Sequence, residues 1–389
     1  MANPMNRRDV IKTGFAAAAL GAAGSFEWIL PALAQGEVMV PFSDSHEKFN
    51  PNPAPDRRLF DTRTLTGAFT PKDQFFTTQH YGHPEIDPAA FRLKVSGLVN
   101  SSLALSLDEI RKMGSTELIA GFECSGNRRP IQGLIGNGRW TGVPLKTVLD
   151  KAGLKANAQE VVFFGADRGK EAVAFRGTNF DVEQQYGRSL PRARALAADP
   201  APFLAYALNG EPLTKHQGAP LRLIVPGWYG APNVKWLSEI VVQEDPYMGK
   251  FQTHWYRTLK GEMINGEMKW VETGITHLNL KSFVARVTKN GNAHKATVIV
   301  LNDGTPIKNV EVQVDGGAWQ PAKADPSTTA KYGWKLYHWD WANATPGEHT
   351  IVSRVTDANG KVQPTEKELE NKKTFLEDNS QHPRKLVIA

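Results

Sequence analysis

The sequence predicts an α+β domain followed by a β-sandwich domain. Between about residues 91 and 256, short β-prone runs alternate with helical stretches, and from about residue 281 onward strands alternate with turns. A chain of 389 residues exceeds what a single hydrophobic core usually covers, which favours two domains. The net charge of +6 is only mildly basic and no dense run of lysine and arginine is present, so we expect no nucleic-acid partner.

Two helices and three strands stand out in the first domain. Ser106 is a suitable N-cap for a helix over 107–112, and Gly153 is suited to end a helix over 145–152. The clearest strand candidates, rich in β-branched and aromatic residues, are 91–95, 161–164 and 221–225. This mixture predicts an α+β domain, which we expect to cover 45–265.

The second domain shows regular strand spacing. Turn signals such as Asp303-Gly304 and Asn359-Gly360 separate the β-prone runs, as expected for a sandwich of two sheets. The runs are 282–288, 296–301, 310–314, 335–341 and 349–356. We expect this domain to cover 275–389, with the stretch 261–274 as the linker.

The amino terminus has the features of a twin-arginine export signal. Arg7 and Arg8 precede a mildly apolar stretch, 14–24, and Ala32-Leu33-Ala34 offers a small-x-small cleavage site. The alternative is an ordinary core helix with two arginines before it. We expect residues 1–34 to be a signal peptide that directs the folded protein to the periplasm. The apolar stretch is too short to span a bilayer and no longer one follows, so we expect no membrane span.

Cys124 is the single cysteine, and it lies in the run Phe122-Glu123-Cys124-Ser125-Gly126-Asn127-Arg128-Arg129. One thiol forms neither an internal disulfide nor a cysteine-rich zinc site. It can be a nucleophile, a buried structural thiol, or the one protein ligand of a soft metal carried by a larger cofactor. The two nearby arginines are expected to favour the deprotonated sulfur and an anionic ligand.

This run resembles the molybdenum-binding segment of the sulfite oxidase family, where Glu/Gln-Cys-Ala/Ser-Gly-Asn-Arg-Arg carries the cysteine that ligates molybdenum. Further blocks resemble the family in the same order: 138–145, and then 216–230 with 234–237, which are similar to its pterin-binding stretch. In the second domain, the blocks 312–319, 339–341 and 354–364 resemble the family's dimerisation domain. The resemblance implies a sulfite-oxidase-type molybdopterin domain, an immunoglobulin-like β-sandwich domain and a homodimer. The charged last 25 residues depart from the family ending, and we expect them to form a tail packed on a partner.

The resemblance also implies roles for individual residues. Cys124 matches the molybdenum ligand, Arg129 matches the arginine that lines the substrate anion site, and Tyr256 matches the active-site tyrosine, whose hydroxyl can donate to an oxoanion. The positions that correspond to pterin contacts are His80, Gln79, Gln217, Arg222, Asn233 and Lys235. His216 and Gln217 straddle a family histidine, and which of them takes its role stays open. Without the family, Tyr256 and His80 are equally readable as core or surface side chains.

One position departs from the pattern. Typical sulfite oxidases have Arg-Asn-His where this chain has Thr78-Gln79-His80, and that arginine contacts the oxoanion. Loss of a charge-assisted bidentate contact costs about 1.5–3 kcal/mol of anion binding. Either another cation substitutes or the substrate is not sulfite.

The resemblance implies a periplasmic sulfite dehydrogenase that carries a molybdenum–molybdopterin cofactor and oxidises sulfite to sulfate. The chain lacks a haem b domain and any Cys-x-x-Cys-His, so we expect no haem in it and electron transfer to a separate protein. The acceptor that we expect is a periplasmic c-type cytochrome. One alternative is a reductase of an S-oxide or N-oxide with the same cofactor, although such enzymes generally lack the sandwich domain. Another is a non-catalytic secreted binding subunit, which the intact Cys124 block argues against.

Overall fold

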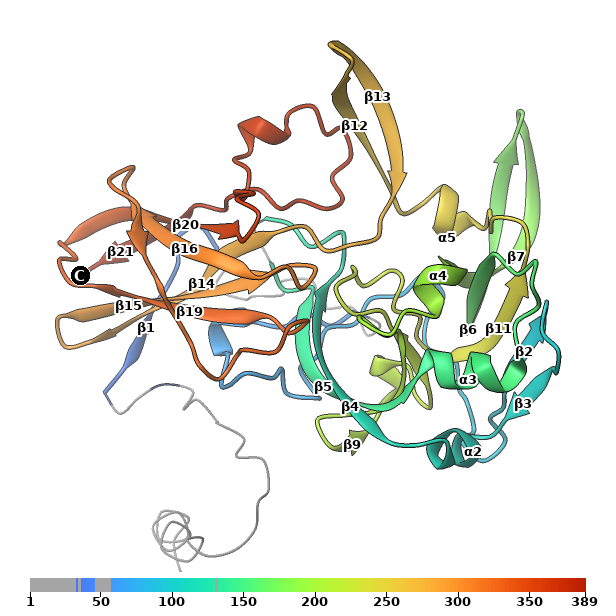
Figure 1. Ribbon diagram of the computed structural model, residues 1–389. Helices are drawn as coiled ribbons and strands as arrows, with labels where there is room; N and C mark the ends of the chain where they lie inside the picture. The colour runs from blue at the N-terminus through green and yellow to red at the C-terminus, as the bar shows by residue number, and fades with distance from the viewer. Residues whose placement is uncertain (1–32, 34–35, 46–56, 130–131) are drawn as a thin grey trace, which may run out of the picture.

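The computed structural model describes residues 33, 36–45, 57–129 and 132–389 (Figure 1). The predicted twin-arginine segment, Arg7 and Arg8, lies outside these residues. The described chain builds an α+β part and a β-sandwich part that lie side by side (Figure 1). The predicted fold class is confirmed.

Two five-stranded sheets form the α+β part. In the first sheet the order is β10-β8-β5-β4, with β9 paired to β8, and in the second it is β3-β2-β11-β6-β7. Only the β11–β2 pair among these described pairs is parallel. The strands of the first sheet are β4 (Thr116–Glu123), β5 (Ile135–Pro144), β8 (Phe203–Leu208), β9 (Glu211–Pro212) and β10 (Arg222–Ile224). Those of the second are β2 (Leu93–Gly97), β3 (Leu103–Leu105), β6 (Glu160–Phe175), β7 (Thr178–Pro191) and β11 (Leu237–Gln243).

Short helices cover the edges of these sheets, and local sequence explains the two that were predicted. Helix α2 (Leu107–Lys112) begins with a capping box in which Ser106 and Glu109 each accept the other's backbone N–H. Helix α3 (Leu145–Ala152) ends at Gly153, whose φ of +67° favours glycine. Both predictions are confirmed. The shorter elements are α4 (Arg192–Ala195), α5 (Lys250–Thr253) and the 3₁₀ turns η1 (Thr62–Thr64), η2 (Lys215–Gln217) and η3 (Lys367–Leu369).

The helices pack their apolar faces on the sheets. Leu145, Val148 and Leu149 of α3 are fully buried in one core with Phe163 and Ile240. Each such buried aliphatic side chain contributes about 1.5–3 kcal/mol to the free energy of unfolding. The core therefore fixes the sheets as a rigid base for the loops between them. No helix among the described ranges is long and apolar enough to cross a membrane.

The second part is a sandwich of two sheets, as predicted. One sheet has the order β1-β14-β15-β19-β18 and the other β17-β16-β20-β21. The tryptophans Trp339 and Trp341 are buried between them with Val298, Val312 and Ile351, which is the core role expected for them. The strands are β1 (Val38–Val40), β14 (Lys281–Asn290), β15 (Ala293–Leu301), β16 (Ile307–Val314), β17 (Gln320–Pro321), β18 (Lys323–Ala324), β19 (Lys335–Trp341), β20 (Gly347–Asp357) and β21 (Arg384–Ile388). Strand β1 joins this sheet from before the catalytic domain, so the sandwich includes residues outside the predicted 275–389.

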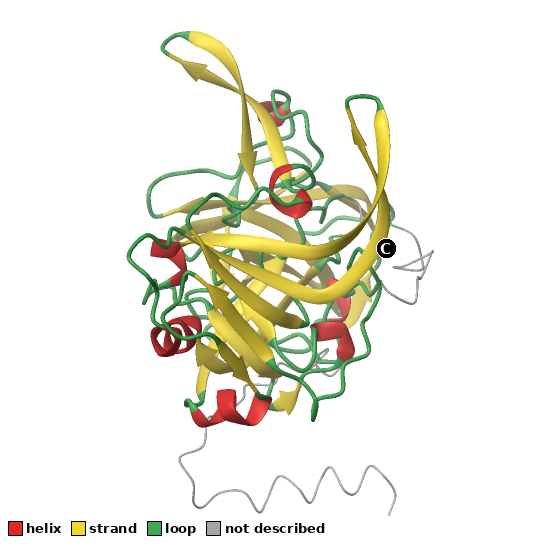
Figure 2. Ribbon diagram, turned by 90° about the vertical axis from the view of Figure 1, so that its right-hand side faces the viewer, coloured by secondary structure: helices red, strands yellow, loops and turns green. Residues whose placement is uncertain are grey.

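The predicted linker is a β-hairpin instead. Strands β12 (Arg257–Ile264) and β13 (Glu267–Gly274) pair along their full length. Asn265 and Gly266 both have positive φ values, 53° and 81°, which suits the two-residue turn of a tight hairpin. Figure 2 shows this hairpin and the outer part of β6–β7 as two arms that project from the same side of the molecule.

The charged carboxyl-terminal segment packs on its own chain. Residues 365–380, here called the C-terminal strap, pair with the base of β12 through Asn371 O, which accepts from Gly261 N at 2.9 Å, and Lys373 N, which donates to Leu259 O at 2.8 Å. Glu377 N donates to Ser125 O at 2.7 Å. The strap therefore packs on the Cys124 segment of its own chain, whereas we had expected the tail to pack on a partner.

Candidate functional site

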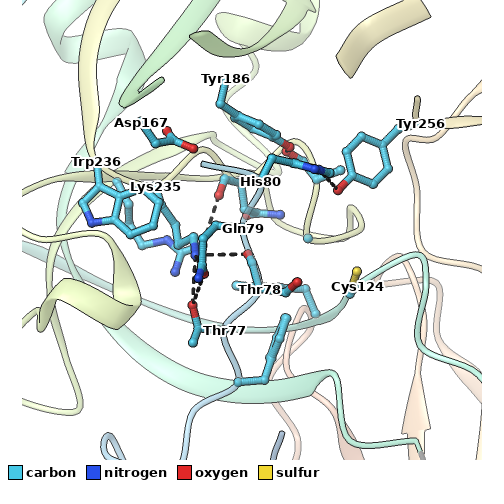
Figure 3. A pocket seen from close by; sticks show the side chains of 16 residues that line it. Thr77, Thr78, Gln79, His80, Cys124, Asp167, Tyr186, Lys235, Trp236 and Tyr256 are labelled. Atoms are coloured by element: carbon cyan, nitrogen blue, oxygen red, sulfur yellow. Dashed lines mark hydrogen bonds between the residues drawn. The ribbon is translucent and has the colours of Figure 1, made fainter. Parts of the chain in front are cut away.

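Most of the predicted site residues line one pocket between the two sheets (Figure 3). The empty space within the pocket and its open mouth amounts to about 580 Å³. Segments 76–80 and 230–236 supply much of its wall. The lining residues predicted from the sequence are Gln79, His80, Cys124, Arg222, Asn233, Lys235 and Tyr256.

Cys124 stands on a tight turn that follows β4. Its N–H donates to Leu134 O at 2.9 Å, and its carbonyl accepts from Asn127 N at 2.8 Å. The Asn127 side chain donates to Glu123 at 2.8 Å and accepts from Leu134 N at 3.0 Å. Glu123 in turn forms a buried ion pair of 2.9 Å with Lys281 of β14, so the turn is anchored to the sandwich. These contacts fix the direction of the sulfur.

The charge around the sulfur differs from our expectation. Neither adjacent arginine contacts Cys124: the Arg128 guanidinium lies over the Phe375 ring at 4.7 Å, and Arg129 pairs with the strap. Burial raises the pKa of the Cys124 thiol above its usual range. The protein alone therefore favours the neutral thiol, and a bound metal ion would have to favour the thiolate.

A lysine organises the wall formed by residues 77–79. Lys235 Nζ donates to Thr77 Oγ1 at 2.9 Å, to Thr78 O at 3.1 Å and to Gln79 Oε1 at 3.2 Å. It also lies 4.3 Å from the centre of the Trp236 ring. The cation thus holds the segment in place while it lines the pocket. Nearby, burial raises the pKa of Asp167 to about 6, and Asp167 also lines the pocket.

His80 and Tyr256 form a hydrogen-bonded pair on the opposite wall. His80 Nε2 lies 2.8 Å from the Tyr256 hydroxyl, and Figure 3 shows the Cys124 sulfur below this pair. Burial lowers the pKa of His80 to about 4 and raises that of Tyr256 well above 10. At neutral pH the pair is therefore a neutral imidazole hydrogen-bonded to a neutral phenol.

Arg222 and Asn233 shape the third wall. The Arg222 guanidinium donates to Gln217 O at 2.9 Å and to Asn233 O at 3.1 Å. Its central carbon lies 5.3 Å from the centre of the Phe122 ring and 5.0 Å from that of Trp140. Burial lowers the pKa of Arg222 to about 9. The Asn233 side chain accepts from Val225 N and donates to Tyr229 O, each at 2.7 Å. Both residues hold the loop that borders the pocket.

Three predicted residues lie away from this pocket. Arg129 forms an ion pair with Glu366 at 2.5 Å, with Asp378 3.9 Å away, on a separate open surface beside the strap. Gln217 is buried and donates to Lys72 O at 2.6 Å while its oxygen caps η2. His216 contacts His83 at 3.1 Å. Arg129 therefore does not line the anion site that we predicted for it.

The structure adds lining residues that sequence reasoning missed. Asp167, Tyr186 and Trp236 border the pocket. A buried acid directly after the apolar strand 161–164 was the available signal for Asp167. Tyr186 gave no such signal, because its hydroxyl reaches Ala231 O at 2.7 Å only in the folded chain.

The residues present fit an anionic pterin that carries a soft metal. Cys124 offers a soft sulfur donor, and Lys235 and Arg222 place two cations on the walls. Arg222 Nε has no hydrogen-bond partner among the described residues although it is buried. A Cβ at Gly230 would lie 3.3 Å from Glu123 O and 3.6 Å from Cys124 Cα, so the glycine lets its loop approach the backbone of the Cys124 turn closely. Cys124 would hold the metal, and Lys235, Gln79 and Arg222 would hold the pterin.

Comparisons with known proteins agree with this assignment. Residues 80–251 match the family model described as the oxidoreductase molybdopterin binding domain. The mitochondrial sulfite oxidase of Rattus norvegicus is 30% identical over 354 residues, which cover 82% of this chain and 61% of the rat protein. Sulfite oxidase of Gallus gallus is 30% identical over 349 residues, or 82% of this chain and 72% of the chicken protein.

The fold also matches a solved structure. The sulfane dehydrogenase SoxCD from Paracoccus pantotrophus aligns with a TM-score of 0.71 and 22% identity, covering 89% of this chain and 95% of the other. This likeness concerns the fold, whereas the sequence matches concern the family. The chain therefore belongs to the sulfite oxidase family of molybdopterin oxidoreductases.

Proposed function

We propose that the protein is a haem-free sulfite dehydrogenase of the periplasm that uses a molybdenum–molybdopterin cofactor. The observation that carries the proposal is the pocket in which Cys124 faces His80, Tyr256 and Lys235. The relatives named sulfite oxidase support the choice of sulfite. Because the chain spans 61% of the length of the rat enzyme, the activity of that whole protein is not transferred without a test.

The reaction converts sulfite and water into sulfate, two protons and two electrons. The bound cofactor would supply the oxygen-atom transfer and take up the electron pair. The Tyr256 hydroxyl is suited to donate a hydrogen bond to the oxoanion, and neutral His80 is suited to accept a proton through it. The Lys235 ammonium group would offset the negative charge of the bound pterin.

We propose that the electrons then pass to a second protein. The 389 residues contain one cysteine, so they contain no Cys-x-x-Cys-His haem-attachment motif. A periplasmic c-type cytochrome is the acceptor that we propose, because the twin-arginine pattern at Arg7 and Arg8 favours export to that compartment. A homodimer through the β-sandwich domain is part of the same proposal.

The test is a steady-state assay on molybdenum-loaded protein with sulfite and oxidised cytochrome c. We expect two cytochromes reduced per sulfite consumed, with activity proportional to molybdenum content. Ferricyanide serves as a second acceptor, which separates failure of the cytochrome from failure of sulfite oxidation. Loaded protein that oxidises no sulfite with either acceptor would contradict the proposal.

One observation favours a second candidate, the reduction of an S-oxide or N-oxide. Thr78 stands where typical relatives have an arginine, and Arg129 lies outside the pocket. The pocket therefore lacks two cations that would bind an anion, which favours a neutral substrate. The same loaded protein should then oxidise a reduced viologen dye with methionine sulfoxide or trimethylamine N-oxide. Turnover in this arm without sulfite oxidation would replace the first proposal.

A further inference from the structure

A buried arginine lies directly behind the wall that carries Tyr256. Arg188 in β7 is 1% exposed. Its guanidinium donates to Phe251 O at 2.5 Å and to Ile275 O at 2.8 Å. The ionisable groups that act on its charge are phenols, Tyr186, Tyr247 and Tyr256, and it forms no ion pair with a carboxylate among the described residues.

The two carbonyls that Arg188 holds lie on either side of Tyr256. Phe251 lies in α5, five residues before Tyr256, and its ring packs against His80 with centroids 4.5 Å apart. Ile275 N donates to Tyr256 O at 3.0 Å, so the chain at 275 is paired to the tyrosine itself. One guanidinium therefore fixes the segments on both sides of the phenol.

The charge of Arg188 is also close to the phenol ring. The guanidinium carbon lies 6.0 Å from the centre of the Tyr256 ring, the outer limit of a cation–π contact. Buried charge acts strongly over such distances because little water screens it. Burial of a cation without a carboxylate partner carries an unfavourable desolvation free energy, and an anion bound at the Tyr256 hydroxyl would offset part of it.

We propose that Arg188 is a positioning residue that fixes the Tyr256 hydroxyl and supplies, from behind it, the positive charge missing at Thr78. The inference rests on the proposed function, since it assumes an oxoanion at the hydroxyl of Tyr256. Thr78 replaces the arginine of typical sulfite oxidases, and the sequence left open whether another cation substitutes for it. Arg188 would be that cation. Arg188 acts through Tyr256 and is not in contact with the substrate.

Three variants separate charge from packing. Arg188→Met keeps the apolar stem and removes the charge, whereas Arg188→Lys keeps the charge and loses the forked hydrogen bonds. Arg168→Gln is the matched control, because Arg168 lies on the same hairpin and is exposed beside Glu183 at 3.4 Å. For each variant we would measure molybdenum content, the unfolding temperature, and kcat and KM for sulfite per molybdenum.

The proposal predicts that Arg188→Met raises KM for sulfite at least about tenfold, as expected for the loss of one charge-assisted interaction. Arg188→Lys should keep KM within about threefold of the wild type even if its unfolding temperature falls. Tyr256→Phe should add less to KM in the Arg188→Met background than in the wild type, because both changes act on one hydroxyl. Arg168→Gln should change none of these values.

Several results would overturn the inference. A purely structural role predicts fewer molybdenum-loaded molecules with an unchanged KM in Arg188→Met, or equal KM values for the lysine and methionine variants. If Arg188→Met does not fold, a tenfold rise in KM for Arg188→Lys, which retains the charge, would itself contradict the proposal.

A binding measurement keeps this test separate from that of the proposed function. If the loaded wild type oxidises no sulfite, calorimetric titration with sulfite still reports whether Arg188 supports anion binding. Binding weakened about tenfold in Arg188→Met supports the role of Arg188. Unchanged binding in that variant, or no sulfite binding by the wild type, overturns it.

Discussion

Single side chains decide how much positive charge reaches the open part of the pocket. Thr78 lines the pocket with a short neutral side chain, and its carbonyl accepts a hydrogen bond from Lys235. Arg129 is held by carboxylates of the strap. The cations that line the pocket, Lys235 and Arg222, are both engaged with groups of the protein.

Thr78→Arg tests whether the missing arginine limits sulfite binding. A guanidinium at this position should lower KM for sulfite by about tenfold or more, because it adds a charge-assisted contact. The measurement is KM per loaded molecule, with Thr78→Gln as a control for side-chain size. If the arginine variant gains sulfite turnover that the wild type lacks, the natural substrate is larger or less charged than sulfite.

Arg129→Gln tests the position of Arg129 in the structure. Its ion pair with Glu366 is partly exposed, and such pairs contribute about 0–1 kcal/mol to the free energy of unfolding. We therefore expect KM for sulfite within about twofold of the wild type and a small change in stability. A large rise in KM with unchanged molybdenum content would place Arg129 at the substrate after all.

At the scale of elements, the Cys124 turn is held by strands from both parts of the chain. The Glu123–Lys281 pair joins the end of β4 to β14 and is 1% exposed on both sides. Lys281 Nζ also donates to Asn127 O at 3.2 Å. The sandwich therefore helps to position the sulfur as well as to complete the fold.

Lys281→Met should remove the ion pair that anchors the Cys124 turn to β14 and so lower the stability of the protein. It leaves the Glu123 carboxyl buried without its cation, which costs about 3–5 kcal/mol of unfolding free energy. The double variant Glu123→Gln with Lys281→Met should recover much of that loss. Urea unfolding measures the effect, and Lys323→Met, an exposed lysine 3.6 Å from Asp340, is the control. Equal stability of Lys281→Met and the control would contradict this account of the turn.

Local signals explain which elements could be predicted. The capping box at Ser106 and the positive φ of Gly153 depend on neighbouring residues, so both helices were predictable. The larger part of the 257–274 hairpin was predicted as a linker because its strands are mostly exposed and therefore lack the regular apolar alternation of a half-buried strand. The strap and the pairing of Arg129 with Glu366, 237 positions away, depend on tertiary packing that no local pattern reports.

At the scale of the whole molecule, cofactor loading, export and the choice of redox partner depend on one another. A twin-arginine signal suits a chain that folds around its cofactor before it leaves the cytoplasm. Most of the residues that resemble cofactor contacts do gather in one pocket, although they come from segments as distant as 79 and 256. The family pattern predicted this gathering, whereas composition alone did not.

Changing Arg7 and Arg8 together to lysine tests the export route. We expect folded, cofactor-loaded protein to remain in the cytoplasm, because the signal is recognised as a pair of guanidinium groups. Cell fractionation with molybdenum analysis of each fraction measures the outcome. An unchanged periplasmic yield would mean that another route exports the chain.

The most direct test of the central claim is sulfite-dependent reduction of cytochrome c by Cys124→Ser compared with the wild type, under conditions that load the cofactor. We expect the variant to keep its fold and to lose turnover, because a serine alkoxide is a harder and more basic donor than the Cys124 thiolate. Circular dichroism and the unfolding temperature would establish that the fold is intact. Wild-type activity in Cys124→Ser would contradict the assignment of Cys124 as the metal ligand.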